Sequence, residues 1–218
     1  MVKTFIVMAA YNEEKDILPV LKKLKKNYKN IIVVDDGSKD NTARIVEKEN
    51  IILIKHKQNQ GKGAAMQTGC DFAISQGADN LVLIDSDGQH LPEEIPRFLE
   101  ALKKVEIVFG YREFDEKMPL KFKIGNKGLN FLTKIILGIK LKDTQSGFRS
   151  MTKEAYKKVR WISKDYSMET EMIAKTAKTN LKYTQVPIST IYLDAKKGTS
   201  YKDGFRILKN MLKWKIRK

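Results

Sequence analysis

The stretch Leu81-Val82-Leu83-Ile84-Asp85-Ser86-Asp87 is a short apolar run that ends in acidic side chains. Such a run, bounded by polar residues, is typical of a strand buried on both faces of a sheet. Residues two apart on extended backbone point the same way, so Asp85 and Asp87 should lie side by side where the strand ends. Paired carboxylates there can hold Mg²⁺ or Mn²⁺, to which Gln89 or His90 could add a ligand. An acidic turn that binds no ligand is the alternative.

The same alternation of apolar runs and helix-like stretches extends through residues 1–110. Strands are predicted over residues 4–9, 31–34, 51–55, 81–84 and 107–109, with helices over residues 13–26, 41–50, 64–75 and 92–104. Apolar strands separated by helices imply an α/β fold whose central sheet is mostly parallel and covered by helices on both faces. Ligands of such sheets bind beyond the carboxyl ends of the strands, so the polar loops should converge on one crevice.

Three further polar segments follow predicted strands. Tyr11-Asn12-Glu13 could stack on or hydrogen-bond to a base, although Asn12 is also a good helix cap. In Asp35-Asp36 the side chains should diverge, so that one accepts hydrogen bonds from a nucleobase or ribose and the other anchors the loop. Gly61-Lys62-Gly63 lacks the spacing of a P-loop or of a dinucleotide-binding loop, which argues against P-loop NTPases and dinucleotide oxidoreductases.

The formal net charge of +16 belongs entirely to the second half of the 218 residues. Residues 1–110 carry 16 basic and 16 acidic side chains, whereas residues 111–218 carry 26 basic and 10 acidic ones. This asymmetry predicts that one part of the chain meets a polyanion or an anionic surface. Nucleic acid is not expected as the partner, because Lys outnumbers Arg and no base-reading motif is present.

The positive charge is concentrated in two amphipathic segments. Basic helices are predicted over residues 118–139, with interruptions at Gly125 and Gly128, and over residues 203–217. Basic amphipathic helices are typical of proteins that lie on an anionic membrane surface, although the last helix could instead pack on the domain. The remaining predicted elements are a helix over residues 168–179 and a strand pair over residues 183–186 and 188–193.

The location of the protein is predicted from what the sequence lacks. Residues 1–10 resemble a strand rather than a signal peptide, and no apolar run of about 18 residues predicts a transmembrane helix. Cys70 is the single cysteine, which excludes an intrachain disulfide and fits a reducing compartment. We therefore expect a cytoplasmic protein that associates peripherally with the membrane.

Four motifs in order resemble those of the family 2 glycosyltransferases, which have the GT-A fold. They are Ala10-Tyr11-Asn12-Glu13, Val34-Asp35-Asp36-Gly37-Ser38, Asn59-Gln60-Gly61-Lys62-Gly63 and Asp85-Ser86-Asp87-Gly88-Gln89-His90. Within that family the chain is similar to the polyprenyl-phosphate sugar synthases, which include the dolichyl-phosphate mannosyltransferases. This narrower similarity covers nearly the whole chain and rests on Leu137-Gly138-Ile139-Lys140-Leu141-Lys142-Asp143, Ser146-Gly147-Phe148-Arg149, Glu169-Thr170-Glu171-Met172 and Val186-Pro187-Ile188.

The resemblance implies a role for each matching position. The nucleotide pocket would be lined by Ala10, Tyr11, Glu13 and Asp36, with Lys62 and Asp85 nearby. The metal would be held by Asp87 and Gln89, with Asp85, together with the donor diphosphate. Arg112 would face the phosphate of the acceptor.

The resemblance also implies a division of labour within one continuous GT-A domain. Residues 1–110 would bind the nucleotide sugar and the metal, and residues 111–218, with the basic helices, would bind the acceptor. The sequence departs from the family at Ala9, where Pro is usual, and the membrane-spanning tail of many relatives is not expected.

The expected reaction is a metal-dependent, inverting sugar transfer to a polyprenyl or dolichyl phosphate from a nucleotide-diphosphate sugar of the GDP-mannose or UDP-glucose type. The metal would act as a Lewis acid on the departing diphosphate. Additional positive charge would come from Lys62, Lys196 or Lys197. Arg112 and Arg149 would orient the acceptor phosphate, although Arg149 could equally brace its loop.

Two alternatives stay open on the sequence alone. A family relative that acts on a saccharide or protein hydroxyl would need a general base, for which the candidates are Asp143, Glu169 and Glu171. A non-catalytic protein that binds an anionic membrane or nucleic acid is the second. His56 and His90 are not expected to be catalytic, and the sequence leaves the donor's base and sugar and the oligomeric state open.

Overall fold

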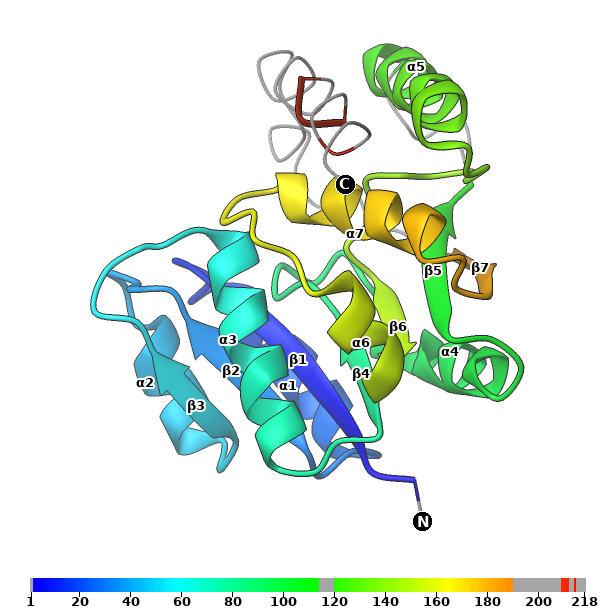
Figure 1. Ribbon diagram of the computed structural model, residues 1–218. Coiled ribbons are helices and arrows are strands. Elements are labelled where there is room, and N and C mark those ends of the chain that lie inside the picture. Colours follow the sequence, from blue (N-terminus) through cyan, green and yellow to red (C-terminus); the bar gives the residue numbers. More distant parts are fainter. Residues whose placement is uncertain (1, 114–119, 190–208, 212–213, 215–218) are drawn as a thin grey trace.

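The computed structural model describes residues 2–113, 120–189, 209–211 and 214, with the backbone alone for residues 120–124. In this part of the chain one sheet has the strand order β3-β2-β1-β4-β6-β5-β7 (Figure 1). The strands are β1 Thr4–Ala10, β2 Ile31–Asp35, β3 Ile52–Lys55, β4 Asn80–Leu83, β5 Ile107–Arg112, β6 Arg149–Thr152 and β7 Tyr183–Ile188. Only β6 runs antiparallel to its neighbours β4 and β5, so the predicted mostly parallel sheet is confirmed.

Helices cover both faces of the sheet, as the sequence predicts (Figure 1). The helices are α1 Ile17–Lys25, α2 Thr42–Lys48, α3 Lys62–Ser75, α4 Ile95–Leu102 after the 3₁₀ turn Pro92–Glu94, α5 Leu120–Leu137, α6 Lys153–Val159 and α7 Ser167–Lys178. One buried apolar cluster joins α3, α6 and α7 to the sheet, and a second joins α1, α2 and α4 to the opposite face. Successive residues of β1 alternate between the two clusters, because side chains of a strand point to opposite faces.

The first helix begins later than predicted. Residues 13–16 form a turn and α1 starts at Ile17, because the backbone N–H groups of Glu13 and Glu14 donate to Thr42 Oγ1 and Asp40 Oδ2. Side chains from the loop after β2 and from the first residue of α2 thus bind the donors that a longer helix would have left unpaired. The segment from β1 to α1 is therefore held against that loop.

The structure differs most from the prediction in the second half. Strand β6 and helix α6 were not predicted, because Arg-Ser-Met-Thr is too polar to resemble an interior strand. The predicted strand pair near the end is a single strand, β7, which pairs with β5 alone among the described residues and so tolerates Pro187 as an edge strand does. Residues 190–193 lie outside the described part.

Helix α5 is continuous, so the predicted interruptions at Gly125 and Gly128 are wrong. A Cβ atom at either glycine would meet nothing within 4 Å, and each glycine costs only about 1 kcal/mol of helix propensity. The helix ends instead before Gly138, whose φ of +73° is the left-handed conformation common after a helix. None of the described helices is long and apolar enough to cross a bilayer.

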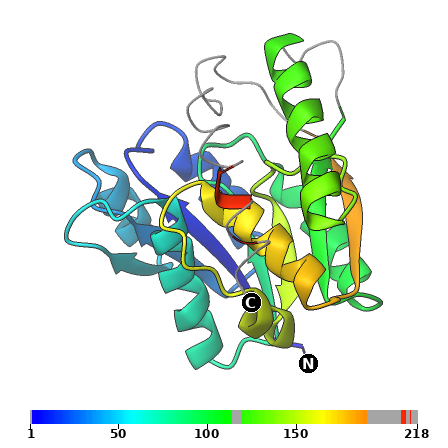
Figure 2. The same ribbon diagram turned by 45° about the horizontal axis from the view of Figure 1, so that its top comes forward.

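Most of the predicted helix over residues 203–217 lies outside the described residues. Its short described segment packs on the domain, beside the start of α7 (Figure 2). Met211 is buried with its sulfur 3.8 Å from Thr133 Oγ1 of α5, and Asn210 Nδ2 donates to Ser167 Oγ at 3.2 Å. At this turn the alternative of packing on the domain is the one observed.

Gly69 lets α3 approach the sheet closely, and this predicts a stability change. A Cβ atom there would lie 2.5 Å from Val7 Cγ1 and 3.1 Å from Val34 Cγ2. Gly69→Ala should therefore lower the free energy of unfolding by about 1–3 kcal/mol in urea titrations, despite the better helix propensity of Ala. The control Gly128→Ala, on an open helix position, should stabilise by up to about 1 kcal/mol. Equal stability of Gly69→Ala and the unsubstituted chain would contradict this packing.

Candidate active site

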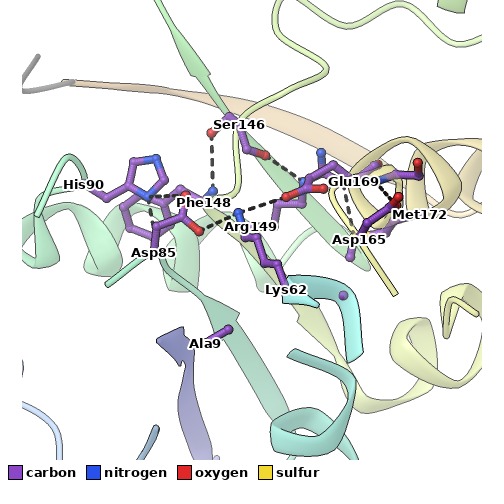
Figure 3. Close-up of polar contacts among 12 residues, drawn as sticks. Ala9, Lys62, Asp85, His90, Ser146, Phe148, Arg149, Asp165, Glu169 and Met172 are labelled. Carbon is purple, nitrogen blue, oxygen red and sulfur yellow. Dashed lines mark hydrogen bonds and ion pairs between the residues drawn. The ribbon is translucent and has the colours of Figure 1, made fainter. Parts of the chain in front are cut away.

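The candidate site lies at one edge of the sheet, where the carboxyl ends of the parallel strands β1, β2, β3 and β4 meet. Its centre is Lys62, the first residue of α3, whose Nζ lies 2.7 Å from Asp85 Oδ1 and 3.0 Å from Glu169 Oε1 (Figure 3). Asp85 follows β4, and Glu169 is in the first turn of α7. The cluster therefore joins three elements that are far apart in the sequence.

The charges of this cluster stabilise one another. Burial alone would raise the pKa of the Asp85 carboxyl, but nearby positive groups, Lys62 first among them, together outweigh burial and lower that pKa to about 2. Burial likewise opposes the charge of Lys62, yet Asp85 and Glu169 raise the pKa of its ammonium. Arg112 also lowers the pKa of Asp85, so the arginine predicted for the acceptor lies within electrostatic range of the acidic cluster.

The backbone of the loop before β6 packs directly on Asp85. A Cβ atom at Gly147 would lie 2.7 Å from Asp85 Oδ2, so only glycine fits there without displacing the carboxylate. On another side, His90 Nδ1 accepts from the Asp85 N–H at 3.4 Å, and its ring lies 5.3 Å from that of Phe148 (Figure 3). Burial lowers the pKa of His90, which keeps the imidazole neutral at pH 7.

Asp87 is the second carboxylate of the predicted metal site. Its pKa is raised, first by burial and then by repulsion from Asp85, so the two carboxylates are close enough to oppose each other's charge. Its Oδ1 accepts from the Gln89 N–H at 3.0 Å. Within the described ranges no three His, Cys, Asp or Glu side chains form a ready-made metal site. A pair of carboxylates with an amide nearby nevertheless fits Mg²⁺ or Mn²⁺, which take oxygen ligands and are often completed by water and substrate phosphate.

The two aspartates after β2 have different partners. Asp36 accepts from the N–H groups of Gln60 and Gly61 at 3.0 and 2.8 Å, and its Oδ1 lies 2.7 Å from His56 Nδ1. Asp36 is therefore the residue that anchors a loop, and its predicted contact with the nucleotide is not supported by this arrangement. Asp35 Oδ1 is buried and has no hydrogen-bond partner among the described residues, so Asp35 keeps the accepting capacity that the sequence assigned to one of the pair.

The loops after β1 and β2 are joined by reciprocal hydrogen bonds. The Asn12 N–H donates to Ser38 Oγ at 2.9 Å, and Asn12 Oδ1 accepts from the Lys39 N–H at 2.8 Å. Asn12 adopts a φ of +56° and bridges the loops instead of capping a helix. Ala10 is buried at the end of β1, whereas the neighbouring Tyr11 is 41% exposed. Tyr11 is thus the residue of this motif with a ring available for stacking.

Arg112, which the sequence predicts to face the acceptor, forms a two-point ion pair with Asp143. Arg112 Nε and NH2 donate to the two carboxylate oxygens of Asp143 at 2.6 and 3.1 Å, and the side chain of Asp143 is fully buried. Burial would raise the pKa of Asp143, but Arg112 lowers it, so this carboxylate is ionised and committed to its partner. Arg112 also lines an open groove of about 440 Å³ with Tyr111, Glu113, Lys127, Asn130 and Lys142.

Arg149 has the bracing role that the sequence left open. It is 1% exposed and donates to the backbone carbonyls of Ser146, Glu169 and Thr144. Burial lowers the pKa of its guanidinium to about 10. Its donors hold the loop before β6 against α7, so an orienting contact with an acceptor is not supported.

Glu171 and the segment before α7 complete the site. Glu171 accepts from the N–H groups of Ile162 and Ser163 and from Ser163 Oγ, and it thereby shapes the chain between α6 and α7. That chain packs on the start of α3, where a Cβ atom at Gly63 would clash with the carbonyl of Ser163.

Sequence reasoning missed the partnership of Lys62 with Glu169 and the packing of Gly147 on Asp85. It also missed Tyr166, whose ring centre lies 5.4 Å from Lys62 Nζ. The Glu-Thr-Glu motif was a signal for Glu169, but the sequence could not show which acid faces the site. Lys196 and Lys197 lie outside the described residues.

The site combines paired carboxylates, a mostly buried lysine and an arginine fixed by an ion pair beside a mostly parallel sheet, which suits an enzyme with phosphorylated ligands. Comparison with known proteins identifies its kind. The family described as Glycosyl transferase family 2 matches residues 5–160, and the chain belongs to that family. It is therefore a glycosyltransferase, and the resemblance seen in the sequence is confirmed.

Two named relatives and one solved structure show which glycosyltransferases the chain is similar to. The chain is 38% identical to a UDP-N-acetylglucosamine–dolichyl-phosphate N-acetylglucosaminyltransferase of Methanococcus voltae, with 98% of this chain and 96% of that protein covered. It is 25% identical to a polyprenol monophosphomannose synthase of Mycolicibacterium smegmatis, with 99% and 88% covered. Glucosyl-3-phosphoglycerate synthase of Mycobacterium tuberculosis, in complex with Mg²⁺ and UDP, has the same GT-A fold, with a TM-score of 0.78, 18% identity, and 97% and 80% covered.

The Asp143–Arg112 pair predicts a pH-dependent contribution to stability. Because its folded pKa is lowered, Asp143 contributes stability that is fully present above its unfolded pKa of about 3.9 and is lost as pH falls towards the folded value. Asp143→Asn should lower the free energy of unfolding at pH 7 by about 2 kcal/mol or more, and this difference should shrink below about pH 4. Urea titrations from pH 7 to pH 3 measure it, with Glu154→Gln as an exposed control. A difference that stays constant across that range would argue against the ion pair.

Proposed function

We propose that this glycosyltransferase moves a sugar, with inversion and with the help of a divalent metal, from a nucleotide-diphosphate sugar to a polyprenyl phosphate. The observation that carries the proposal is the proximity of two oppositely charged groups of residues. Asp85 and Asp87 suit the metal and the donor, and Arg112 lies within electrostatic range of Asp85. Relatives with polyprenyl or dolichyl phosphate in their names support the same acceptor class.

On the donor side, Asp85, Asp87 and Gln89 would hold the metal, as the sequence predicts. When bound, Mg²⁺ or Mn²⁺ supplies a Lewis acid that neutralises the departing nucleotide diphosphate. Lys62, whose ammonium stays charged, adds a second positive group for the same diphosphate. Asp35 Oδ1 and the exposed ring of Tyr11 are the groups suited to the base or ribose.

On the acceptor side, the arrangement of the acids favours a phosphate over a hydroxyl. A phosphate arrives ionised and needs no base, whereas a hydroxyl needs one. The three suspected bases are engaged elsewhere, because Asp143 is bound to Arg112, Glu169 to Lys62, and Glu171 to backbone N–H groups and Lys175. The groove beside Arg112 adds the positive charge of Lys127 and Lys142.

The sugar and base of the donor are left open by the described contacts. The predicted GDP-mannose and UDP-glucose types remain candidates, and the name of the Methanococcus voltae relative adds UDP-N-acetylglucosamine. Each should therefore be tried as the donor.

The proposed transfer is tested by following a radiolabelled sugar into lipid that partitions into organic solvent. We expect label to enter polyprenyl phosphate when Mg²⁺ or Mn²⁺ is present and to stop with a chelator. Asp87→Ala should lower the rate by about 100-fold or more, since a metal contributes several kcal/mol to the transition state. Glu154→Gln should leave the rate unchanged. Transfer to a saccharide hydroxyl with no lipid product would refute the acceptor class.

We further propose that α5 brings the enzyme to an anionic membrane, where its acceptor resides. Phe131 and Ile135 are 63% and 59% exposed and, four residues apart, lie on one side of the helix. Exposed lysines flank them at Lys127, Lys134 and Lys140. Each such charge near an anionic surface contributes about 1 kcal/mol, so apolar insertion and charge would act together. The cytoplasmic location stays a prediction.

Sedimentation with liposomes that contain anionic lipid tests this surface. Binding of the full chain should fall as salt rises, and Phe131→Ser/Ile135→Ser should weaken it by roughly tenfold or more. Ile162→Ser is the matched control, because Ile162 is 64% exposed but belongs to the loop before α7. Equal loss in both variants, or binding that ignores salt, would contradict a role for α5.

A further inference from the structure

Lys62 contacts a carboxylate oxygen of Asp85, one of the predicted metal ligands. Its Nζ lies 2.7 Å from Asp85 Oδ1, close enough for a full ion pair, and both side chains are mostly buried. Both oxygens of Asp85 lie against the backbone of Gly147, where a Cβ atom would be 2.7 and 2.8 Å from them, and Oδ2 also lies 3.7 Å from His90 Nδ1. A second cation that bound Asp85 would thus meet the Lys62 ammonium at short range.

The charges around the cluster show which electrostatic repulsion a second cation would meet. Lys62 Nζ already contacts the carboxylates of both Asp85 and Glu169, and the nearby Arg112 is paired with Asp143. A divalent cation alone would place uncompensated positive charge beside a lysine whose side chain is mostly buried. A divalent cation accompanied by a diphosphate would not.

We propose that Lys62 competes with the divalent cation for Asp85, and that the donor diphosphate relieves this competition by offering phosphate oxygens to the Lys62 ammonium. The inference rests on the proposed function and adds an order of binding to it. The metal would bind tightly only together with the nucleotide. Lysine suits such an exchange, since it is a point charge with three donors on a flexible stem.

Glu169 is the positioning residue of this exchange. Its carboxylate lies 3.0 Å from Lys62 Nζ, is almost fully buried, and belongs to a helix whose backbone is held by Arg149. In the described part of the chain Glu169 Oε2 has no hydrogen-bond partner, and Oε1 is the oxygen that faces Lys62. Lys62 can therefore leave Asp85 without losing all its partners, and the ammonium stays beside the diphosphate.

Direct measurement of Mn²⁺ binding tests the competition without relying on activity. Free Mn²⁺ is quantified by electron paramagnetic resonance with the full chain, with and without UDP or GDP. Without nucleotide, Lys62→Gln should bind Mn²⁺ roughly tenfold or more tightly than the unsubstituted chain, because a like charge nearby changes the affinity of a carboxylate by one or more log units. With nucleotide this difference should vanish or reverse, since the variant lacks a diphosphate partner.

Two controls separate the possible outcomes. Lys62→Arg keeps the charge and should bind Mn²⁺ no better than the unsubstituted chain. This variant also carries the test if Lys62→Gln does not unfold cooperatively on heating. Lys175→Met removes a lysine that pairs with Glu171, the residue one turn earlier in α7. It should leave Mn²⁺ affinity unchanged. Equal Mn²⁺ affinity of Lys62→Gln and the unsubstituted chain without nucleotide, or tighter binding by Lys62→Arg, would overturn the inference. Failure of the unsubstituted chain to bind Mn²⁺ even with nucleotide would instead refute the proposed function.

Discussion

The ion pair of Lys62 with both Asp85 and Glu169 is the interaction on which the arrangement of the site depends. It joins the start of α3, the end of β4 and the first turn of α7, and thus the neutral and the basic halves of the chain. Removing one partner would leave a buried charge uncompensated, which costs more than the pair itself contributes. The site is therefore held in shape by the same charges that are proposed to bind its ligands.

Close backbone packing is the second constraint, and glycine makes it possible. Gly61 and Gly63 let the chain before α7 lie against the start of α3, and Gly147 brings the loop before β6 onto Asp85. Arg149 then fixes that loop by donating to three backbone carbonyls. Loops held in this way keep the acids at fixed positions. The acidic and basic side chains of the site therefore pair without a movement of the backbone.

The sequence predicted the first half well because its signals there are local. Apolar runs followed by polar residues identified β1, β2 and β4 and the edge at which the loops converge. It failed for β6, since a polar strand is recognised only by its neighbours β4 and β5. It also could not assign Asp35 and Asp36, because adjacent acids are told apart only by the loop that reaches one of them.

The acids of the second half explain why the acceptor should bring its own charge. Asp143 holds Arg112 with both oxygens and has a lowered pKa, so it is a poor base but a good support for a guanidinium. A buried carboxylate orients the arginine as a rigid fork, the geometry that recognises phosphate. An enzyme for hydroxyl acceptors would need one acid left uncommitted, and in the described cluster each acid of this half already has a partner.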